Sequence, residues 1–196
     1  RPYHSRGIAY QDKGNLDQAL LDYNRAIEIE PNYVLVYNNR GNVYRKNGNL
    51  DQAFSDYNKA IEINPNYADA YNNRGNAYQT KGDLNQAILD YNKAIEIKPN
   101  DAEAYYNRGL AYQDKGNLDQ AFLDYNRAIE INPNYADAYN NRGNAYQDKG
   151  DLNQAFSDYN KAIEMNPNFA KAYNNRGTAY QDKGNLDQAF LDYNRA

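Results

Sequence analysis

The chain contains no cysteine and no tryptophan, and it has one histidine and one methionine. Without cysteine there is no disulfide framework, no thiolate nucleophile and no cysteine-bound zinc cluster. A single histidine removes most catalytic triads and most histidine-based metal sites. We therefore predict that this chain is not an enzyme and has no catalytic residue, no metal site and no cofactor.

Aliphatic residues are also scarce, because Leu, Ile, Val and Phe together make up 32 of the 196 residues. In a highly charged chain this share indicates disorder. The net charge here is only −4, and 22 tyrosines and 25 alanines supply apolar surface instead. We therefore expect a folded core of aromatic rings packed against small residues.

Long hydrophobic runs are missing as well, which disfavours a helix that crosses a membrane. A pI near 5.1 disfavours nucleic acid and an anionic membrane surface as partners. No signal peptide is visible, and the first residue is Arg1, so we interpret the chain as a segment of a longer protein. The sequence leaves the compartment open and favours the cytoplasm.

A period of 34 residues runs through the whole sequence. Six Arg-Gly pairs and six alanines keep this step, and so do five prolines, which are Pro31, Pro65, Pro99, Pro133 and Pro167. The repeats are residues 1–33, 34–67, 68–101, 102–135, 136–169 and a truncated 170–196. We predict that they stack into one solenoid domain over residues 1–196.

Each repeat predicts two helices. In the second repeat these run from about Tyr33 to Asn47 and from about Leu50 to Ile63, with a glycine that ends the first helix. Asn32 and its equivalents are the expected N-caps of the first helices, and Asn49 and its equivalents those of the second helices. The Asn47-Gly48 pair is also typical of a β-hairpin, but its flanks repeat with helical spacing and favour a helix–helix turn.

Three tyrosine positions recur in all six repeats, and in the second repeat they are Tyr37, Tyr44 and Tyr57. Tyr37 and Tyr44 lie seven residues apart on one face of the first helix and are expected to face Ala53 and Tyr57 of the second. Gly41 allows the two helices to approach closely. A ligand-binding aromatic box is the alternative for these rings, but repetition through all six repeats favours core packing.

The spacing of Tyr37, Gly41, Tyr44, Ala53, Tyr57, Ala60 and Pro65 resembles the signature of the tetratricopeptide repeat family over essentially the whole chain. The resemblance implies an all-α fold, a right-handed α-solenoid of antiparallel helix pairs. It also implies a binding module whose first helices line a concave groove that commonly holds an extended peptide or a partner helix.

The Arg40 position departs from the family pattern, which more often has an aliphatic residue there. Asp56 repeats with the same period, so we predict a structural ion pair between paired helices, since a lone buried guanidinium would be costly. A functional anion site is the alternative.

The stripe of the first helix opposite the core tyrosines is rich in asparagine and is expected to line the groove. An amide offers a donor and an acceptor, so a ladder of amides pairs with the backbone of an extended peptide without reading its side chains. The predicted binding residues are Asn38, Asn39, Asn42, Arg45, Lys46, Asn72, Asn73, Asn76, Asn107, Asn140, Asn141, Asn144, Asn174 and Asn175. The alternative is that asparagine is simply frequent in this sequence, since it also fills caps and positions taken as exposed, such as Asn58.

Charge along this stripe changes sign, because Arg45 and Lys46 are basic where later repeats carry Gln and Asp. We therefore expect a protein or an extended peptide, neutral to basic, as the partner. The family's carboxylate clamp, which binds acidic C-terminal tails of chaperones, is disfavoured because Asn38 and Asn72 replace its lysine. His4 replaces a groove asparagine and is expected to be exposed and neutral.

Two further features of the sequence bear on function. Asp12, Asn15 and Asp17 superficially resemble a calcium loop, but the bidentate Glu is missing, so a helix-connecting turn is favoured. The chain stops at Ala196 inside a second helix that keeps the internal pattern, which suggests head-to-tail self-association through uncapped ends as a second function.

Overall fold

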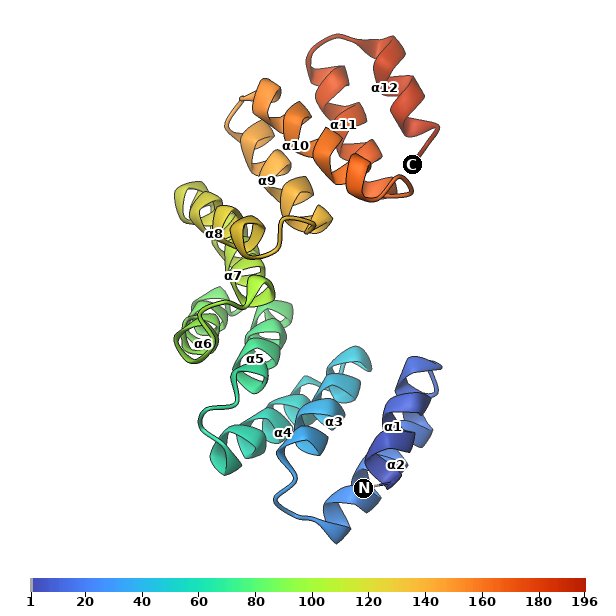
Figure 1. Ribbon diagram of the computed structural model, residues 1–196, viewed down its shortest axis with the longest axis vertical. Helices are drawn as coiled ribbons and strands as arrows, with labels where there is room; N and C mark the ends of the chain where they lie inside the picture. Colours follow the sequence, from blue (N-terminus) through green and yellow to red (C-terminus); the bar gives the residue numbers. More distant parts are fainter. Residues whose placement is uncertain (1) are drawn as a thin grey trace. The chain divides into compact units, whose positions relative to one another are not determined.

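The computed structural model describes residues 2–196, and this range folds into twelve α-helices without a strand (Figure 1). The helices are α1 (Pro2–Asp12), α2 (Leu16–Ile29), α3 (Val34–Lys46), α4 (Leu50–Ile63), α5 (Ala68–Lys81), α6 (Leu84–Ile97), α7 (Ala102–Asp114), α8 (Leu118–Ile131), α9 (Ala136–Asp148), α10 (Leu152–Met165), α11 (Ala170–Asp182) and α12 (Leu186–Tyr193). Each repeat of the sequence is one helix pair, which confirms the all-α repeat solenoid.

The helix pairs fall into two compact halves, Arg1–Pro99 with α1 to α6 and Asn100–Ala196 with α7 to α12. Within each half the second helix of a pair packs against the first helix of the next pair, as α2 does on α3 and α8 on α9. Each half is thus a stack of three helix pairs. A single domain over residues 1–196 stays a prediction.

A glycine ends the first helix of every repeat, and it has a positive φ, as at Gly48 (78°) and Gly82 (85°). This left-handed conformation turns the chain into the next helix without a side-chain penalty. The expected N-caps of the second helices are confirmed at four positions, where the cap side chain accepts a hydrogen bond from the backbone N–H of the Gln three residues on. These caps are Asn15, Asp83, Asn117 and Asp151.

The expected N-caps of the first helices are wrong by one residue. The residue that caps α5 is Tyr67, whose side chain makes no capping hydrogen bond, and Asn66 lies in the preceding turn. There the Asn66 N–H donates to Asn64 Oδ1 (3.0 Å) and the Tyr67 N–H to the Asn64 carbonyl (3.1 Å). The turn after each proline therefore ends one residue later than expected; at α7 the cap is Asp101, which accepts from the Glu103 N–H.

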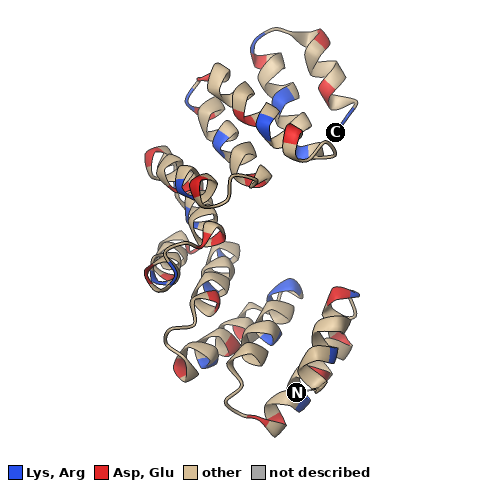
Figure 2. Cartoon of the chain, viewed as in Figure 1, with Lys and Arg blue, Asp and Glu red and all other residues tan. Residues whose placement is uncertain are grey.

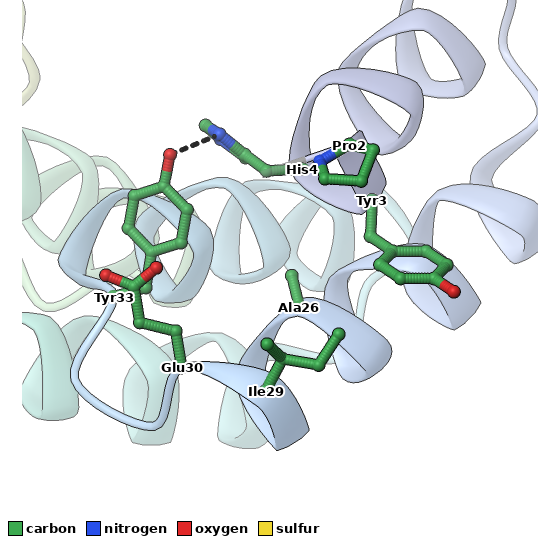
Figure 3. Close-up of a pocket in the computed structure, with 7 residues that line it drawn as sticks. All are labelled: Pro2, Tyr3, His4, Ala26, Ile29, Glu30 and Tyr33. Carbon is green, nitrogen blue, oxygen red and sulfur yellow. Dashed lines mark hydrogen bonds between the residues drawn. The ribbon is translucent and has the colours of Figure 1, made fainter.

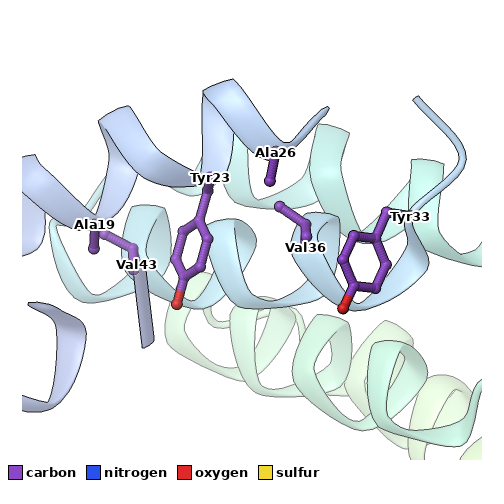
Figure 4. Packing of buried hydrophobic residues seen from close by; sticks show 6 residues of the cluster. All are labelled: Ala19, Tyr23, Ala26, Tyr33, Val36 and Val43. Carbon is purple, nitrogen blue, oxygen red and sulfur yellow. The ribbon is translucent and has the colours of Figure 1, made fainter. Parts of the chain in front are cut away.

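The core consists of tyrosine rings and alanines, as expected. Tyr57 and Ala53 are fully buried, and a Cβ at Gly41 would lie 2.7 Å from Tyr57 Cε1. Figure 4 shows the core one repeat earlier, where Ala19 and Tyr23 of α2 form one buried cluster with Val36 and Val43 of α3 in the next repeat. The missing side chain at the glycine is thus what leaves room for a whole ring between the paired helices.

The predicted Arg–Asp ion pair between paired helices is confirmed. Arg40 Nε and Nη2 donate to the two carboxylate oxygens of Asp56 at 2.8 and 2.6 Å. The equivalent pairs are Arg6–Asp22, Arg74–Asp90, Arg108–Asp124, Arg142–Asp158 and Arg176–Asp192. Burial lowers the pKa of Arg40, but the hydrogen bonds to Asp56, the charge of that carboxylate and two nearby tyrosines together raise it, so the guanidinium stays charged.

Candidate functional site

The first helices form the inner side of each half. Cα atoms of α1 and α3, and of α3 and α5, approach within 8 Å, and the same holds for α7 with α9 and α9 with α11. Within either half, no Cα pair joins the second helices of successive repeats at that distance in the described chain. Because the first helices lie closer together than the second helices, each half is concave on the side of its first helices.

The Asn ladder comprises Asn39, Asn73, Asn107, Asn141 and Asn175, one residue on each of five successive first helices. Asn73 Nδ2 donates to Asn38 Oδ1 at 2.9 Å, and Asn175 Nδ2 donates to Asn140 Oδ1 at 3.0 Å. These bonds join residues 35 positions apart, so each amide reaches the first helix of the preceding repeat. Within each half, these bonds therefore tie successive first helices together.

Two rungs of the ladder use a different acceptor. Asn141 Nδ2 donates to the Tyr106 hydroxyl at 2.7 Å, and Asn39 Nδ2 lies 3.0 Å from His4 Nε2. Tyr106 and His4 stand where other repeats carry the accepting asparagine. The bridge across the repeat boundary is thus kept although its acceptor changes.

The accepting asparagines are almost excluded from solvent. Asn38 and Asn140 accept these bonds and are 4 and 3% exposed, and Asn72 at the equivalent position is 7% exposed, whereas Asn39, Asn73 and Asn141 of the ladder are half-buried. Asn107 is buried, and Asn174 in the last repeat is exposed. Among the predicted binding residues, the ladder therefore presents more of its amides to the groove than the neighbouring position does.

A third set of amides accepts hydrogen bonds from the core tyrosines. The Tyr57 hydroxyl donates to Asn42 Oδ1 at 2.8 Å, and Tyr91 and Tyr159 bond in the same way to Asn76 and Asn144. Burial raises the pKa of Tyr57 to about 12, so this hydroxyl stays a donor at neutral pH. The groove amides are thus oriented by the core beneath them.

A second row of bonds crosses the repeat boundaries near the ends of the first helices, and sequence reasoning missed it. Gln147 Nε2 donates to Asp182 Oδ2 at 2.7 Å, and Gln113 Nε2 to Asp148 Oδ2 at 3.3 Å. Both Gln and Asp recur with the repeat, but the offset of 35 residues is visible only in the structure. In the second repeat these two positions are Arg45, which is half-buried, and Lys46, which is exposed.

His4 is buried, with 7% of its surface exposed, so the expectation of an exposed histidine is wrong. Its Nδ1 lies 2.9 Å from the Tyr33 hydroxyl, and both residues line a cavity of about 110 Å³ together with Ile29 and Glu30 (Figure 3). Both ring nitrogens have polar neighbours, which places His4 in the packing between the first two repeats.

The described residues were compared with the requirements of a metal site and of a membrane-spanning helix. In residues 2–196, no group of three or more His, Cys, Asp or Glu side chains could hold a metal ion. Over the same residues, no helix combines the length and the apolar character needed to cross a membrane.

Family models of known proteins match this chain over nearly its whole length. Family models described as TPR repeat match residues 7–48, 41–82, 80–116 and 111–150, and models described as Tetratricopeptide repeat match residues 136–169 and 158–190. A search of curated proteins gave no match.

Solved structures with the same fold include MamA, which is 33% identical over 79% of this chain and 91% of that chain, with a TM-score of 0.69. YrrB, described as a TPR protein with an unusual peptide-binding site, is 26% identical over 88% of this chain and 89% of that chain, with a TM-score of 0.67. PilF of Pseudomonas aeruginosa, 18% identical over 97% of this chain and 87% of that chain, has a TM-score of 0.86 and shows the fold alone. The chain belongs to the tetratricopeptide repeat family, whose stacked helix pairs form scaffolds for protein interaction.

Proposed function

We propose that the concave face of the first helices binds an extended peptide or partner segment through the Asn ladder, and that the chain acts by binding and not by catalysis. The observation that carries this proposal is the hydrogen bonding of the Asn73 amide in the ladder. An amide group has two N–H donors and a carbonyl acceptor. The bridge from Asn73 to Asn38 uses one donor of Asn73, which leaves its second N–H and its carbonyl for a ligand backbone.

The bridges also hold the amides in place before a ligand arrives. Immobilising a mobile side chain on binding costs about 0.5–1.5 kcal/mol of conformational entropy. A side chain that is already ordered loses less. Each hydrogen bond to a ligand nets only about 1 kcal/mol. Several fixed amides in succession therefore suit a long ligand better than a small one.

Two further observations support a peptide of neutral to basic character. YrrB is described as having a peptide-binding site, and this chain is similar to it over most of its length. Asp148 and Asp182 lie exposed near the ends of α9 and α11, where they would attract a basic side chain.

The test begins with peptides selected for binding to the wild-type chain from a random peptide library. The variant Asn73→Ala/Asn107→Ala/Asn141→Ala removes three rungs, and we expect it to lose at least tenfold in affinity for the selected peptides, since each lost bond is worth about 1 kcal/mol.

The matched control removes bridges of another kind. Asn58, Asn126 and Asn160 on the second helices accept hydrogen bonds from arginines of the following repeat. Their triple alanine variant loses three bonds between repeats without touching the ladder, so it should keep peptide affinity. Equal affinity of the ladder variant and the wild type, with both chains folded by circular dichroism, would remove the proposal.

Head-to-tail self-association is a second candidate, favoured by the ring of Phe190. Phe54 packs on Tyr78 with ring centroids 4.5 Å apart, and Phe156 packs on Tyr180 in the same way, whereas Phe190 is 65% exposed. In a second copy Tyr10 occupies the position equivalent to those tyrosines. Phe190→Ser should then lower the association of this chain measured by sedimentation, and a strict monomer at high concentration contradicts the candidate.

A further inference from the structure

Arg45 and Lys46 interrupt the charge pattern of the groove in the N-terminal half. They end α3, which is blue at this end in Figure 2. The residues equivalent to Arg45 are Gln11, Gln79, Gln113, Gln147 and Gln181, and those equivalent to Lys46 are Asp12, Thr80, Asp114, Asp148 and Asp182. Two cations thus replace amide, hydroxyl and carboxylate side chains.

The position that would supply a counter-ion to Arg45 carries none. In the C-terminal half the equivalent Gln147 donates to Asp182 on the next first helix. The residue in that place for Arg45 is Thr80, whose hydroxyl donates to the Asn76 carbonyl of its own helix (2.8 Å). The row of bonds between first helices is therefore broken at Arg45, and the break leaves a cation without a carboxylate.

The bonds of Arg45 itself are incomplete. Its Nε is buried and has no hydrogen-bond partner, and no ion pair in the described chain involves Arg45 or Lys46. The Arg45 charge and a hydrogen bond between its side chain and Tyr57 partly oppose the burial-driven rise in the pKa of Tyr57, so the guanidinium lies beside that hydroxyl.

We propose that Arg45 and Lys46 form a carboxylate-binding subsite, which takes one acidic side chain of the segment that the Asn ladder holds. A guanidinium presents two N–H groups in a fork that matches a carboxylate, and the Lys46 ammonium adds a second charge. Such charge-assisted bonds are about twice as strong as neutral ones. The subsite rests on the proposed function and adds a side-chain requirement to a groove that otherwise reads backbone.

The subsite sets a charge preference in the N-terminal half alone, where the bound segment carries an acidic residue at the end of α3. The expectation of a neutral to basic segment applies to the part of the first helices that carries Asp148 and Asp182.

The experiment uses an isotope-labelled 196-residue chain and follows the Nε–Hε signal of Arg45 and the backbone amides at the end of α3 by NMR. The probes are three N-acetylated tripeptides: C-amidated Gly-Glu-Gly, C-amidated Gly-Gln-Gly, and Gly-Gly-Gly with a free carboxyl end. At millimolar concentration the Glu probe should shift these signals and the Gln probe should not. A stronger response to the free carboxyl end than to Glu overturns the assignment to an acidic side chain.

Two variants give matched controls. Arg45→Gln/Lys46→Asp gives α3 the Gln-Asp end found in the later repeats, and Thr80→Asp supplies the missing carboxylate without altering either cation. Both should weaken the Glu response, read from the backbone amides at the end of α3, by about tenfold, which corresponds to about 1.4 kcal/mol. Thr80→Ser keeps the hydroxyl and should leave the response unchanged.

Equal shifts by the Glu and Gln probes, no shift by either, or an unchanged response in Arg45→Gln/Lys46→Asp overturns the subsite. A tripeptide is too short to span the Asn ladder. The ladder is therefore tested by the long peptides alone, and the subsite by the tripeptides alone. A negative result in either experiment removes only its own proposal.

Discussion

Arg40 Nη1 donates to Asn24 Oδ1 at 2.6 Å, while the other side of the same guanidinium holds Asp56. Asn24 belongs to the preceding repeat, so one side chain joins two helix pairs. The same bond recurs from Arg74 to Asn58 and from Arg142 to Asn126. The arginine of each of these repeats therefore joins the two helices of its own pair and also bonds to the preceding pair.

The link predicts a stability effect at a partly exposed asparagine. Asn24→Ala leaves one arm of the Arg40 guanidinium without its acceptor and should lower the free energy of unfolding by about 1 kcal/mol. Asn24→Asp keeps the acceptor and adds a negative charge, so it should be as stable as the wild type or more so. Urea unfolding monitored by circular dichroism measures both, and an alanine variant as stable as the wild type contradicts the prediction.

The contact between Gly41 and Tyr57 predicts a larger effect. A methyl group at Gly41 would lie 2.7 Å from a fully buried ring, so the paired helices must separate. Overpacking of this kind costs about 1–3 kcal/mol, against a gain of about 1 kcal/mol in helix propensity. We expect Gly41→Ala to lower the thermal midpoint, and Gly41→Ala/Tyr57→Leu to regain part of the loss. A single variant more stable than the wild type shows that the ring has room to move.

Buried tyrosines predict a loss of stability at alkaline pH. Burial raises the pKa of Tyr23 and Tyr57 to about 12, above the ordinary value of about 10. Between these values the unfolded chain loses phenolic protons that the folded chain keeps, so the free energy of unfolding falls as pH rises. Their contribution is fully present below about pH 10 and is lost as pH approaches 12.

The measurement is urea unfolding at a series of pH values from 8 upward, with tyrosinate absorbance followed in the folded chain. Tyr57→Phe removes one such group, and it should show a shallower fall of stability with pH than the wild type. A stability that stays flat through the titration of the unfolded tyrosines contradicts the prediction.

The contacts between neighbouring helix pairs predict that the chain still folds when one repeat is deleted. Within each half a helix pair touches only the adjacent pairs in the described chain, so stability is a sum over neighbours. Deleting residues 68–101 should leave a folded, shorter stack with lower stability and a helical circular dichroism spectrum. Complete loss of helical signal at room temperature shows instead that the array unfolds as a single unit.

The sequence by itself determined the repeat, the helix pairs and their core. A strict period of 34 residues places Tyr37, Gly41 and Tyr57 on facing sides of two helices whatever the larger arrangement is. The same argument paired Arg40 with Asp56, because both recur with the repeat and a buried guanidinium needs a counter-ion. These relationships lie inside one helix pair, where helical geometry alone fixes which side chains meet.

The tertiary structure decided how the repeats are joined. Periodicity put Asn38 and Asn39 on one groove stripe, but the crossing of successive first helices buries Asn38 as an acceptor and leaves Asn39 half-buried as a donor. It also gave a role to the position of Asn58, which the sequence placed among exposed asparagines, because Asn24 at the equivalent position accepts a hydrogen bond from Arg40. A helical period says which residues share a face of one helix, whereas the offset of 35 residues between bonded amides depends on the angle and spacing of two helices, which no single repeat contains.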